Sequence, residues 1–494
     1  MTRYGGGARL GAVAIAVLCL AAEPIGWSAA APPSAQPDAS SWMPPPVNPA
    51  ALPVDTPPGP PAGVTYTQKF GCVSSVDDNA PLPDEPAAQQ MLDIRTAQQF
   101  STGAGVKVAV IDTGVNPNRL LTDNNRLKGG GDYITPGQAD GTLDCDGHGT
   151  LTAGIVAANT SHTDFGFTGV APAATIYSIR QTSKVYDEQF HGQDTGLTAG
   201  TPSTLASAIV HAVNLGVNVI TTSVDVCQPT ATAVAEMRQF GSPVQELQAA
   251  IAYAVEHDVV VVNSAGNVVS QPEGGQQASN NPCANIPQND NPNPNDVREI
   301  EIPAVFSNDL LSVASVSPIT GSVSMFSVWG PWVNIAAPGE GIVSVNPARG
   351  GQGLARLFAE PDSNTRAPGP IQGTSFAAPY VAGVVALVRA KYPKLTARQV
   401  ITRIEATAQH PSGPGGRNNQ IGYGVINPVA ALTAAIPGQN GVPAVGDNQV
   451  PVVLPGGPVQ DWAPVRVALI GTAVAMALLF GTVFVVRTVR RRRT

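Results

Sequence analysis

Short continuous apolar runs recur along the middle of the chain. Three of them predict buried strands, at residues 106–111, 217–221 and 259–262. An amphipathic stretch precedes each of the last two runs, and the first of these stretches predicts a helix that starts at Ser203 or Thr204. Helices that alternate with continuous apolar strands indicate βαβ units around a parallel sheet, which is an α/β fold.

Candidate site residues follow each of the three predicted strands. Asp112 follows the first strand, Ser223, Val224 and Asp225 follow the second, and Asn267 follows the third. Functional sites of open α/β sheets form beyond the carboxyl ends of the strands. We therefore expect these residues to lie at one edge of the sheet.

The N-terminus has the pattern of a secretory signal peptide. Arg3 and Arg9 precede an apolar run over residues 10–22, and small residues follow at 28–30. The run is too short to span a bilayer. Basic residues, a short apolar run and small residues in this order predict a signal peptide over 1–30.

The C-terminus has the pattern of a membrane anchor. No charged residue interrupts the stretch from Val467 to Val486, whose length is about the 20 residues that a bilayer core requires. Arginines follow at once, which predicts a transmembrane helix over 466–487 and a basic cytoplasmic tail over 488–494. Together with the signal peptide, this predicts a single-pass protein of the cell membrane whose main domain lies on the extracytoplasmic, periplasmic side.

Two Pro-rich segments flank the patterned part of the chain. Residues 31–88 form an N-terminal extension that favours extended backbone and cannot build a core of its own. Residues 437–465 are rich in Pro and Gly and predict a linker. One domain over 89–436 remains between them.

Composition and cysteine content narrow the function and the compartment. The net charge is −8, and the one dense basic cluster is at the extreme C-terminus, so the chain has no nucleic-acid footprint. Without Cys19 in the signal peptide, four cysteines remain: Cys72, Cys145, Cys227 and Cys283. An even number in an oxidising compartment predicts two disulfides, for which three pairings are possible.

The candidate chemistry is nucleophilic catalysis by a serine. Asp112 lies in VIDTGV, His148 in DGHGT and Ser375 in GTSFAAP. Serine becomes a nucleophile when a histidine takes its proton, and a carboxylate orients that histidine. Taken singly, each residue has a structural alternative: an Asx-turn for Asp112, a structural histidine for His148, and a helix cap for Ser375.

These motifs, together with SAGN at 264–267, resemble those of the subtilisin-like serine proteases (subtilases) over roughly residues 90–436. The resemblance implies a three-layer fold with a central parallel sheet flanked by helices, and a serine endopeptidase with Asp112, His148 and Ser375 as its triad. It also implies that Asn267 and the backbone N–H of Ser375 bind the oxyanion. The substrate-binding residues would be Ser223, Val224, Asp225, Ala265 and Gly266.

The signal peptide, the extension and the basic-flanked anchor together resemble the mycosins, membrane-anchored subtilases associated with type VII secretion. This implies cleavage of a restricted set of cell-envelope or secreted proteins, and components of the secretion membrane complex as partners. An alternative is a mainly structural subunit of that complex, for which proteolysis is dispensable.

The mycosin pattern also implies an extension that wraps on the catalytic domain as a strap. Cys227 and Cys283 follow neighbouring strand ends, which favours their pairing and leaves Cys72 in the extension with Cys145.

One residue departs from the family pattern, and no cofactor is expected. Asp225 stands where subtilases commonly carry Gly, which adds a side chain and a charge at the rim of the substrate site. Asp290 and Asp296 lie in an Asn-rich loop without the spacing of a calcium-binding loop, so we expect no metal site.

Overall fold

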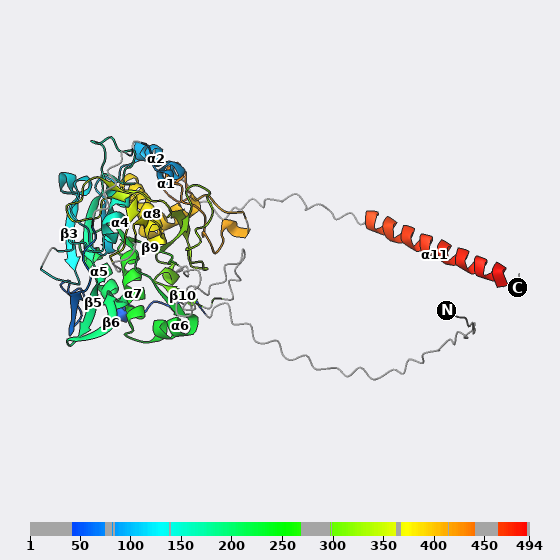
Figure 1. The fold of residues 1–494 in the computed structure, drawn as a ribbon, viewed down its shortest axis with the longest axis horizontal. Helices are drawn as coiled ribbons and strands as arrows, with labels where there is room; N and C mark the ends of the chain where they lie inside the picture. Colours follow the sequence, from blue (N-terminus) through cyan, green and yellow to red (C-terminus); the bar gives the residue numbers. More distant parts are fainter. Residues whose placement is uncertain are drawn as a thin grey trace, which may run out of the picture. The chain divides into compact units, whose positions relative to one another are not determined.

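The computed structural model describes residues 42–74, 82, 84–137, 140–267, 297, 299–361, 367–412, 414–439 and 463–491. These residues form two compact units, 1–434 and 435–494. In the first unit a twisted sheet is flanked by helices, as Figure 1 shows. The signal peptide expected over 1–30 lies outside the described residues.

The central sheet has seven parallel strands in the order β12-β11-β9-β7-β2-β4-β3. The strands are β2 (Lys107–Asp112), β3 (Leu127–Asp132), β4 (Thr175–Arg180), β7 (Val219–Thr222), β9 (Val260–Ser264), β11 (Leu311–Val316) and β12 (Ile335–Pro338). The three strands predicted from apolar runs are confirmed as β2, β7 and β9, with bounds shifted by one or two residues at each end. They are neighbours in the sheet, so their carboxyl ends meet at one edge.

Helices of this unit pack on the sheet in pairs: α4 with α8, and α5 with α7. The helices are α1 (Ala87–Leu92), α2 (Ile94–Phe100), α3 (Arg119–Thr122), α4 (His148–Ala157), α5 (Pro202–Asn214), α6 (Thr230–Arg238), α7 (Pro243–Glu256), α8 (Thr374–Lys391), α9 (Ala397–Ala406) and α10 (Pro428–Thr433). The helix predicted to start at Ser203 or Thr204 is confirmed as α5, which begins at Pro202, one residue before Ser203. Thr201 is the N-cap, and its hydroxyl accepts a hydrogen bond from the Thr204 N–H. Pro202 is the first helical residue, a position where a missing N–H costs nothing.

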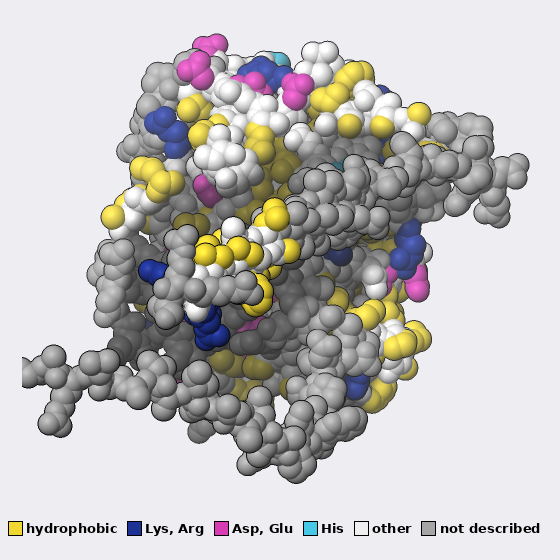
Figure 2. Space-filling model, turned by 90° about the vertical axis from the view of Figure 1, so that its right-hand side faces the viewer, with side chains coloured by type: hydrophobic (Ala, Val, Ile, Leu, Met, Phe, Trp, Pro, Cys, Tyr) yellow, Lys and Arg dark blue, Asp and Glu magenta, His cyan; other side chains and the backbone are white. Residues whose placement is uncertain are grey.

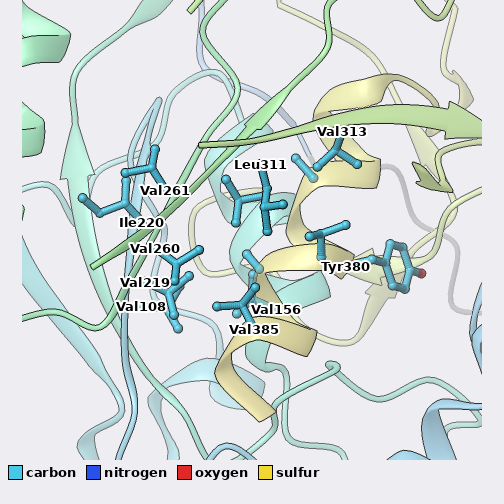
Figure 3. Packing of buried hydrophobic residues seen from close by; sticks show 14 of the residues in the cluster. Val108, Val156, Val219, Ile220, Val260, Val261, Leu311, Val313, Tyr380 and Val385 are labelled. Carbon is cyan, nitrogen blue, oxygen red and sulfur yellow. The ribbon is translucent and has the colours of Figure 1, made fainter. Parts of the chain in front are cut away.

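The sheet is covered on both faces, which explains why its strands are continuous apolar runs. Figure 3 shows Val108, Val219 and Val260 gathered near Val156 of α4 and Val385 of α8. Successive side chains of a strand point to opposite faces, so Ile220 and Val261 lie on the other side of the sheet. All these side chains are fully buried.

Smaller sheets surround this core. Their strands are β1 (Val64–Gln68), β5 (Ser183–Phe190), β6 (Gln193–Ala199), β8 (Val226–Pro229), β10 (Glu299–Ile302), β13 (Ser344–Val345), β14 (Leu354–Ala355), β15 (Leu357–Phe358) and β16 (Gly369–Pro370). They pair in the orders β1-β5-β6, β10-β8, β13-β14 and β15-β16.

The described part of the N-terminal extension packs on the catalytic domain. Its strand β1 pairs antiparallel with β5, a pairing that the Pro-rich composition did not predict. The predicted disulfide between Cys72 and Cys145 is confirmed and joins the extension to the segment before α4. Trp42 packs edge-on against the buried Trp332. Cys283 lies outside the described residues, so its pairing with Cys227 stays a prediction.

The second unit contains α11 (Ala463–Arg491). It includes the stretch predicted to cross the membrane. Within the part of the chain that the structure describes, no helix has the length and apolar character needed to cross a membrane.

The surface of the molecule carries charges of both signs. On the face shown in Figure 2, described basic side chains lie scattered among acidic and apolar ones. Opposite charges pair at several points, for example Lys69 with Asp187 at 2.8 Å and Arg398 with Asp309 at 2.7 Å. Such exposed pairs each stabilise a fold by at most about 1 kcal/mol.

Candidate active site

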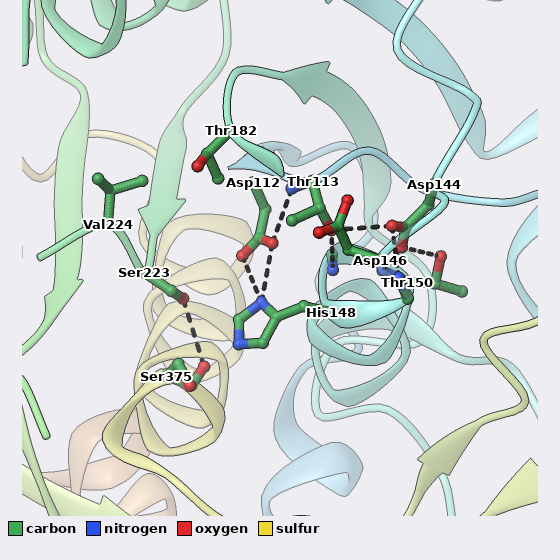
Figure 4. Close-up of polar contacts among 12 residues, drawn as sticks. Asp112, Thr113, Asp144, Asp146, His148, Thr150, Thr182, Ser223, Val224 and Ser375 are labelled. Carbon is green, nitrogen blue, oxygen red and sulfur yellow. Dashed lines mark hydrogen bonds and ion pairs between the residues drawn. The ribbon is translucent and has the colours of Figure 1, made fainter. Parts of the chain in front are cut away.

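Asp112 and His148 form an ion pair at the carboxyl edge of the sheet. Asp112 is the last residue of β2, and its two carboxylate oxygens lie 2.8 and 3.0 Å from His148 Nδ1. The backbone N–H of Thr113 donates to the same carboxylate at 2.7 Å. His148 is the first residue of α4, so the end of a strand and the start of a helix bring the pair together (Figure 4).

A second carboxylate, Asp144, connects these two elements. Its Oδ1 accepts hydrogen bonds from the Thr113 hydroxyl at 2.8 Å and the Gly147 N–H at 2.6 Å. Its Oδ2 accepts from the Thr150 N–H at 2.9 Å and the Thr150 hydroxyl at 2.6 Å. Burial raises the pKa of Asp144, and these hydrogen bonds oppose that effect. Sequence reasoning missed Asp144, although it lies four residues before His148 and two residues before the motif DGHGT.

Ser375 lies at the start of α8 and faces the histidine. Figure 4 shows the imidazole of His148 between the Asp112 carboxylate and Ser375. No hydrogen bond joins His148 Nε2 to Ser375 Oγ in the described structure. Catalytic hydrogen bonds of this kind commonly tighten only when substrate is bound. The capping position belongs to Gly373, and Ser375 is the second residue of the helix.

Asn267 presents its amide nitrogen to the same space as the serine hydroxyl. Its Oδ1 accepts hydrogen bonds from the Thr374 N–H at 2.9 Å and the Thr374 hydroxyl at 3.1 Å. This fixes the orientation of the amide. A Cβ built at Gly373 would lie 3.0 Å from Ser375 Oγ and 3.8 Å from Asn267 Nδ2. The two atoms therefore border one small volume, which a side chain at position 373 would fill.

The environment of His148 favours its charged form. Burial lowers the pKa of His148, but the negative charge of Asp112 and its hydrogen bond raise it, and the net effect is a raised pKa. The ring of Phe376 packs against the imidazole with 4.9 Å between the centroids. The histidine is thus held in place from two sides and suited to accept a proton.

A cleft of about 290 Å³ surrounds these residues. Of the predicted substrate-binding residues, Ser223, Val224 and Asp225 line it, whereas Ala265 is fully buried at the end of β9. Ser223 also donates a hydrogen bond to the backbone oxygen of Ser375 at 3.4 Å. Further lining residues that the sequence did not indicate are Asp146, Thr182, Lys184, Phe358 and Glu360.

Several carboxyl groups and one lysine line this cleft. Lys184 and Glu360 form an ion pair at 2.8 Å. Asp146 accepts hydrogen bonds from the Ser183 hydroxyl at 2.5 Å and from the Lys184 N–H at 2.7 Å. Burial and, to a smaller extent, the charge of Asp144 raise the pKa of Asp146 to about 6. Asp290 and Asp296, considered for a metal site, lie outside the described residues.

Comparison with known proteins agrees with this architecture. The model of the subtilase family, Peptidase_S8, matches residues 103–424. This is the class to which the fold and the Asp, His and Ser side chains point.

Similarity to particular relatives extends over nearly the whole chain. Mycosin-3 of Mycobacterium tuberculosis strain H37Rv is 38% identical over 490 residues, which cover 97% of this chain and 98% of that protein. The solved structure of the MycP3 protease from the type VII (ESX-3) secretion system has 38% sequence identity and a TM-score of 0.65, and the match covers 80% of this chain and 100% of that one. A chain of the intact ESX-5 inner membrane complex has 35% identity and a TM-score of 0.65 over 90% of this chain and 100% of its own length. The chain therefore belongs to the mycosins, within the subtilase family of serine proteases.

Proposed function

We propose that this chain is a serine endopeptidase in which Asp112, His148 and Ser375 form the catalytic triad. The observation that carries the proposal is the Asp112–His148 pair at 2.8 Å, facing a serine hydroxyl and an oriented amide nitrogen across one small volume. Helix capping would not require an oriented histidine or the amide of Asn267 at that point.

The geometry supports the following order of events. Ser375 Oγ attacks the peptide carbonyl while His148 Nε2 takes its proton, and Asp112 stabilises the resulting imidazolium through Nδ1. The oxyanion accepts hydrogen bonds from Asn267 Nδ2 and from the backbone N–H of Ser375, which lies in the first turn of α8, where backbone donors have no partner within the helix. His148 then protonates the leaving amine, and water hydrolyses the acyl-enzyme by the same route.

The proposed nucleophile can be tested by covalent labelling of the full chain. We expect wild-type protein to react with a fluorophosphonate probe at Ser375, and a Ser375→Ala variant not to react. A matched control is Ser161→Ala, because Ser161 is an exposed serine remote from the site. Equal labelling of Ser375→Ala and wild type would contradict the assignment.

We further propose that the protein acts at the cell membrane as part of a type VII secretion complex and cleaves a restricted set of cell-envelope or secreted proteins. The support is twofold: the similarity to a chain of the ESX-5 inner membrane complex, and the uncharged stretch Val467–Val486 followed by arginines. In this proposal residues 466–487 anchor the chain with its C-terminus in the cytoplasm. Deleting residues 466–494 should move the protein from the membrane fraction to the soluble fraction.

A structural role in that complex is the second candidate function, and the same similarity to a complex subunit favours it. The two functions are separated by complementing a deletion strain with Ser375→Ala. If secretion returns with this inert variant, the structural role does not depend on proteolysis. If only wild type restores secretion, the peptidase is needed for export.

A further inference from the structure

Asp225 lies beside the proposed oxyanion site. It belongs to the segment that continues from β7, lines the cleft and is exposed there. Asn267 and Ser375 line the same cleft. The side-chain amide of the same asparagine borders the volume next to Ser375. The carbonyl under attack would bind in this volume. The side chain of the same substrate residue would then be within reach of Asp225.

Glu301 places a second carboxyl group behind Asp225. It lies on β10, which pairs with β8 directly after Asp225, and 1% of the residue is exposed. In the register of the two strands Glu301 lies opposite Cys227. A Cβ built at Gly266, where φ is +97°, would lie 2.8 Å from Glu301 Cδ. Glycine at position 266 therefore lets this carboxyl group approach the segment that leads to Asn267.

The cleft that Asp225 lines is predominantly acidic. His148 is paired with Asp112, and Lys184 with Glu360. Asp146 and Asp225 add two further carboxyl groups to the lining. Burial raises the pKa of Glu301 well above its usual range, and the nearby charge of Asp225 raises it further. A cation bound at Asp225 would offset this repulsion.

We propose that Asp225, supported by Glu301, makes the cleft select substrates with a lysine or arginine at the residue whose carbonyl is attacked. This specificity rests on the proposed function, because it assumes that Asn267 and Ser375 bind that carbonyl. Asp225 supplies the carboxylate that the substrate cation contacts. Glu301 lies behind Asp225, and a cation bound at Asp225 favours the ionised form of Glu301, which then adds to the negative field in a partly desolvated site.

The test uses full-length protein and fluorogenic peptides that differ only at this residue: Lys, Arg, norleucine or Glu. Norleucine preserves the length of the lysine stem without its charge. We expect kcat/KM for the Lys and Arg peptides to exceed that for norleucine by about tenfold or more, because a close charge pair in such a site supplies at least this much. The Glu peptide should be the poorest substrate.

The variants Asp225→Asn and Glu301→Gln measure the two contributions. We expect Asp225→Asn to abolish the Lys-over-norleucine preference and Glu301→Gln to reduce it about threefold. Both replacements nearly preserve shape. Glu256→Gln, an exposed residue at the end of α7, is the matched control and should leave the preference unchanged.

Two results would overturn the inference while leaving the proposed function intact: equal or better cleavage of the norleucine peptide by wild type, or an unchanged preference in Asp225→Asn. Fluorophosphonate labelling of Ser375 is run in parallel. Absence of both labelling and peptide cleavage would contradict the proposed function, and the specificity with it.

Discussion

Asp144, on the His148 side of the cleft, and Glu301, on the Asn267 side, are both buried carboxyl groups with 1% of each residue exposed. Burial raises the pKa of both groups. At Asp144, hydrogen bonds from Thr113, Gly147 and Thr150 oppose the rise, whereas at Glu301 the charge of Asp225 adds to it. One side of the cleft thus uses a buried carboxylate to join two elements, and the other places two carboxyl groups close together beside the proposed substrate position.

This difference shows that the groups around a buried carboxyl group determine its role. A carboxylate surrounded by donors stabilises one arrangement of backbone, because displacing it would leave several buried donors without partners. The electrostatic repulsion between two neighbouring carboxyl groups is reduced when a cation from outside binds beside them. We therefore expect the Asp144 side to govern catalytic geometry and stability, and the Asp225 side to govern substrate choice.

The largest effect should follow from breaking the ion pair on the catalytic side. Asp112→Asn removes the charge that stabilises the imidazolium and favours the wrong tautomer of His148. We expect kcat to fall by about 10⁴-fold, with little change in KM. Steady-state kinetics with one good peptide substrate measure both constants, and Asp187→Asn on β5, away from the triad, serves as the control. A loss confined to KM would contradict a role in the chemical step.

The disulfide anchors the same side of the cleft, because Cys145 lies between Asp144 and Asp146. The bond closes a loop with a sequence separation of 73 residues. Replacing both Cys72 and Cys145 by Ser should lower the free energy of unfolding by about 4 kcal/mol in the chain-entropy treatment. Denaturant unfolding measures this change, with the disulfide-bonded wild type as the reference. A difference below about 1 kcal/mol would mean that the extension is held mainly by its β1 pairing.

Removing the Asp144 carboxylate should disturb stability and catalysis together. Asp144→Ala leaves donors of Thr113, Gly147 and Thr150 without their acceptor. We expect the free energy of unfolding to fall by about 3 kcal/mol. The end of β2 and the start of α4 should also be held together less tightly, which weakens the contact between Asp112 and His148. The pH profile of kcat/KM, which reports the His148 pKa, should then shift to lower pH, and a purely structural role would leave this profile in place.

The smallest effect concerns the pH dependence of stability. The pKa of Asp146 in the folded protein is about 6, above the ordinary value of 3.8. The folded state therefore binds this proton more tightly than the unfolded state, and its contribution to stability is present at low pH and is lost as pH rises through about 6. Asp146→Asn should flatten the change in the free energy of unfolding between pH 4 and pH 7. An unchanged slope would show that Asp146 titrates at its ordinary pKa.

Much of the catalytic edge could be predicted because its signals are local. Apolar runs over 106–111 and 259–262 identify buried strands, and a polar residue after each one marks the carboxyl edge. The short motifs around His148 and Ser375 are local signals too, and they identify the reacting side chains. Strand β1 could not be predicted, because its Pro-rich surroundings disfavour a strand and its pairing with β5 spans more than a hundred residues of sequence.

By itself the sequence determined which residues are available for chemistry and which runs must be buried, since apolar periodicity and short motifs are properties of neighbouring residues. The tertiary structure alone decided which polar groups meet. Asp144 reaches Thr113 across 31 positions, and Glu301 reaches the backbone beside Gly266 across 35. A carboxylate acquires its pKa and its role from such contacts. Their energies depend on distance and desolvation in the folded chain, which no local pattern encodes.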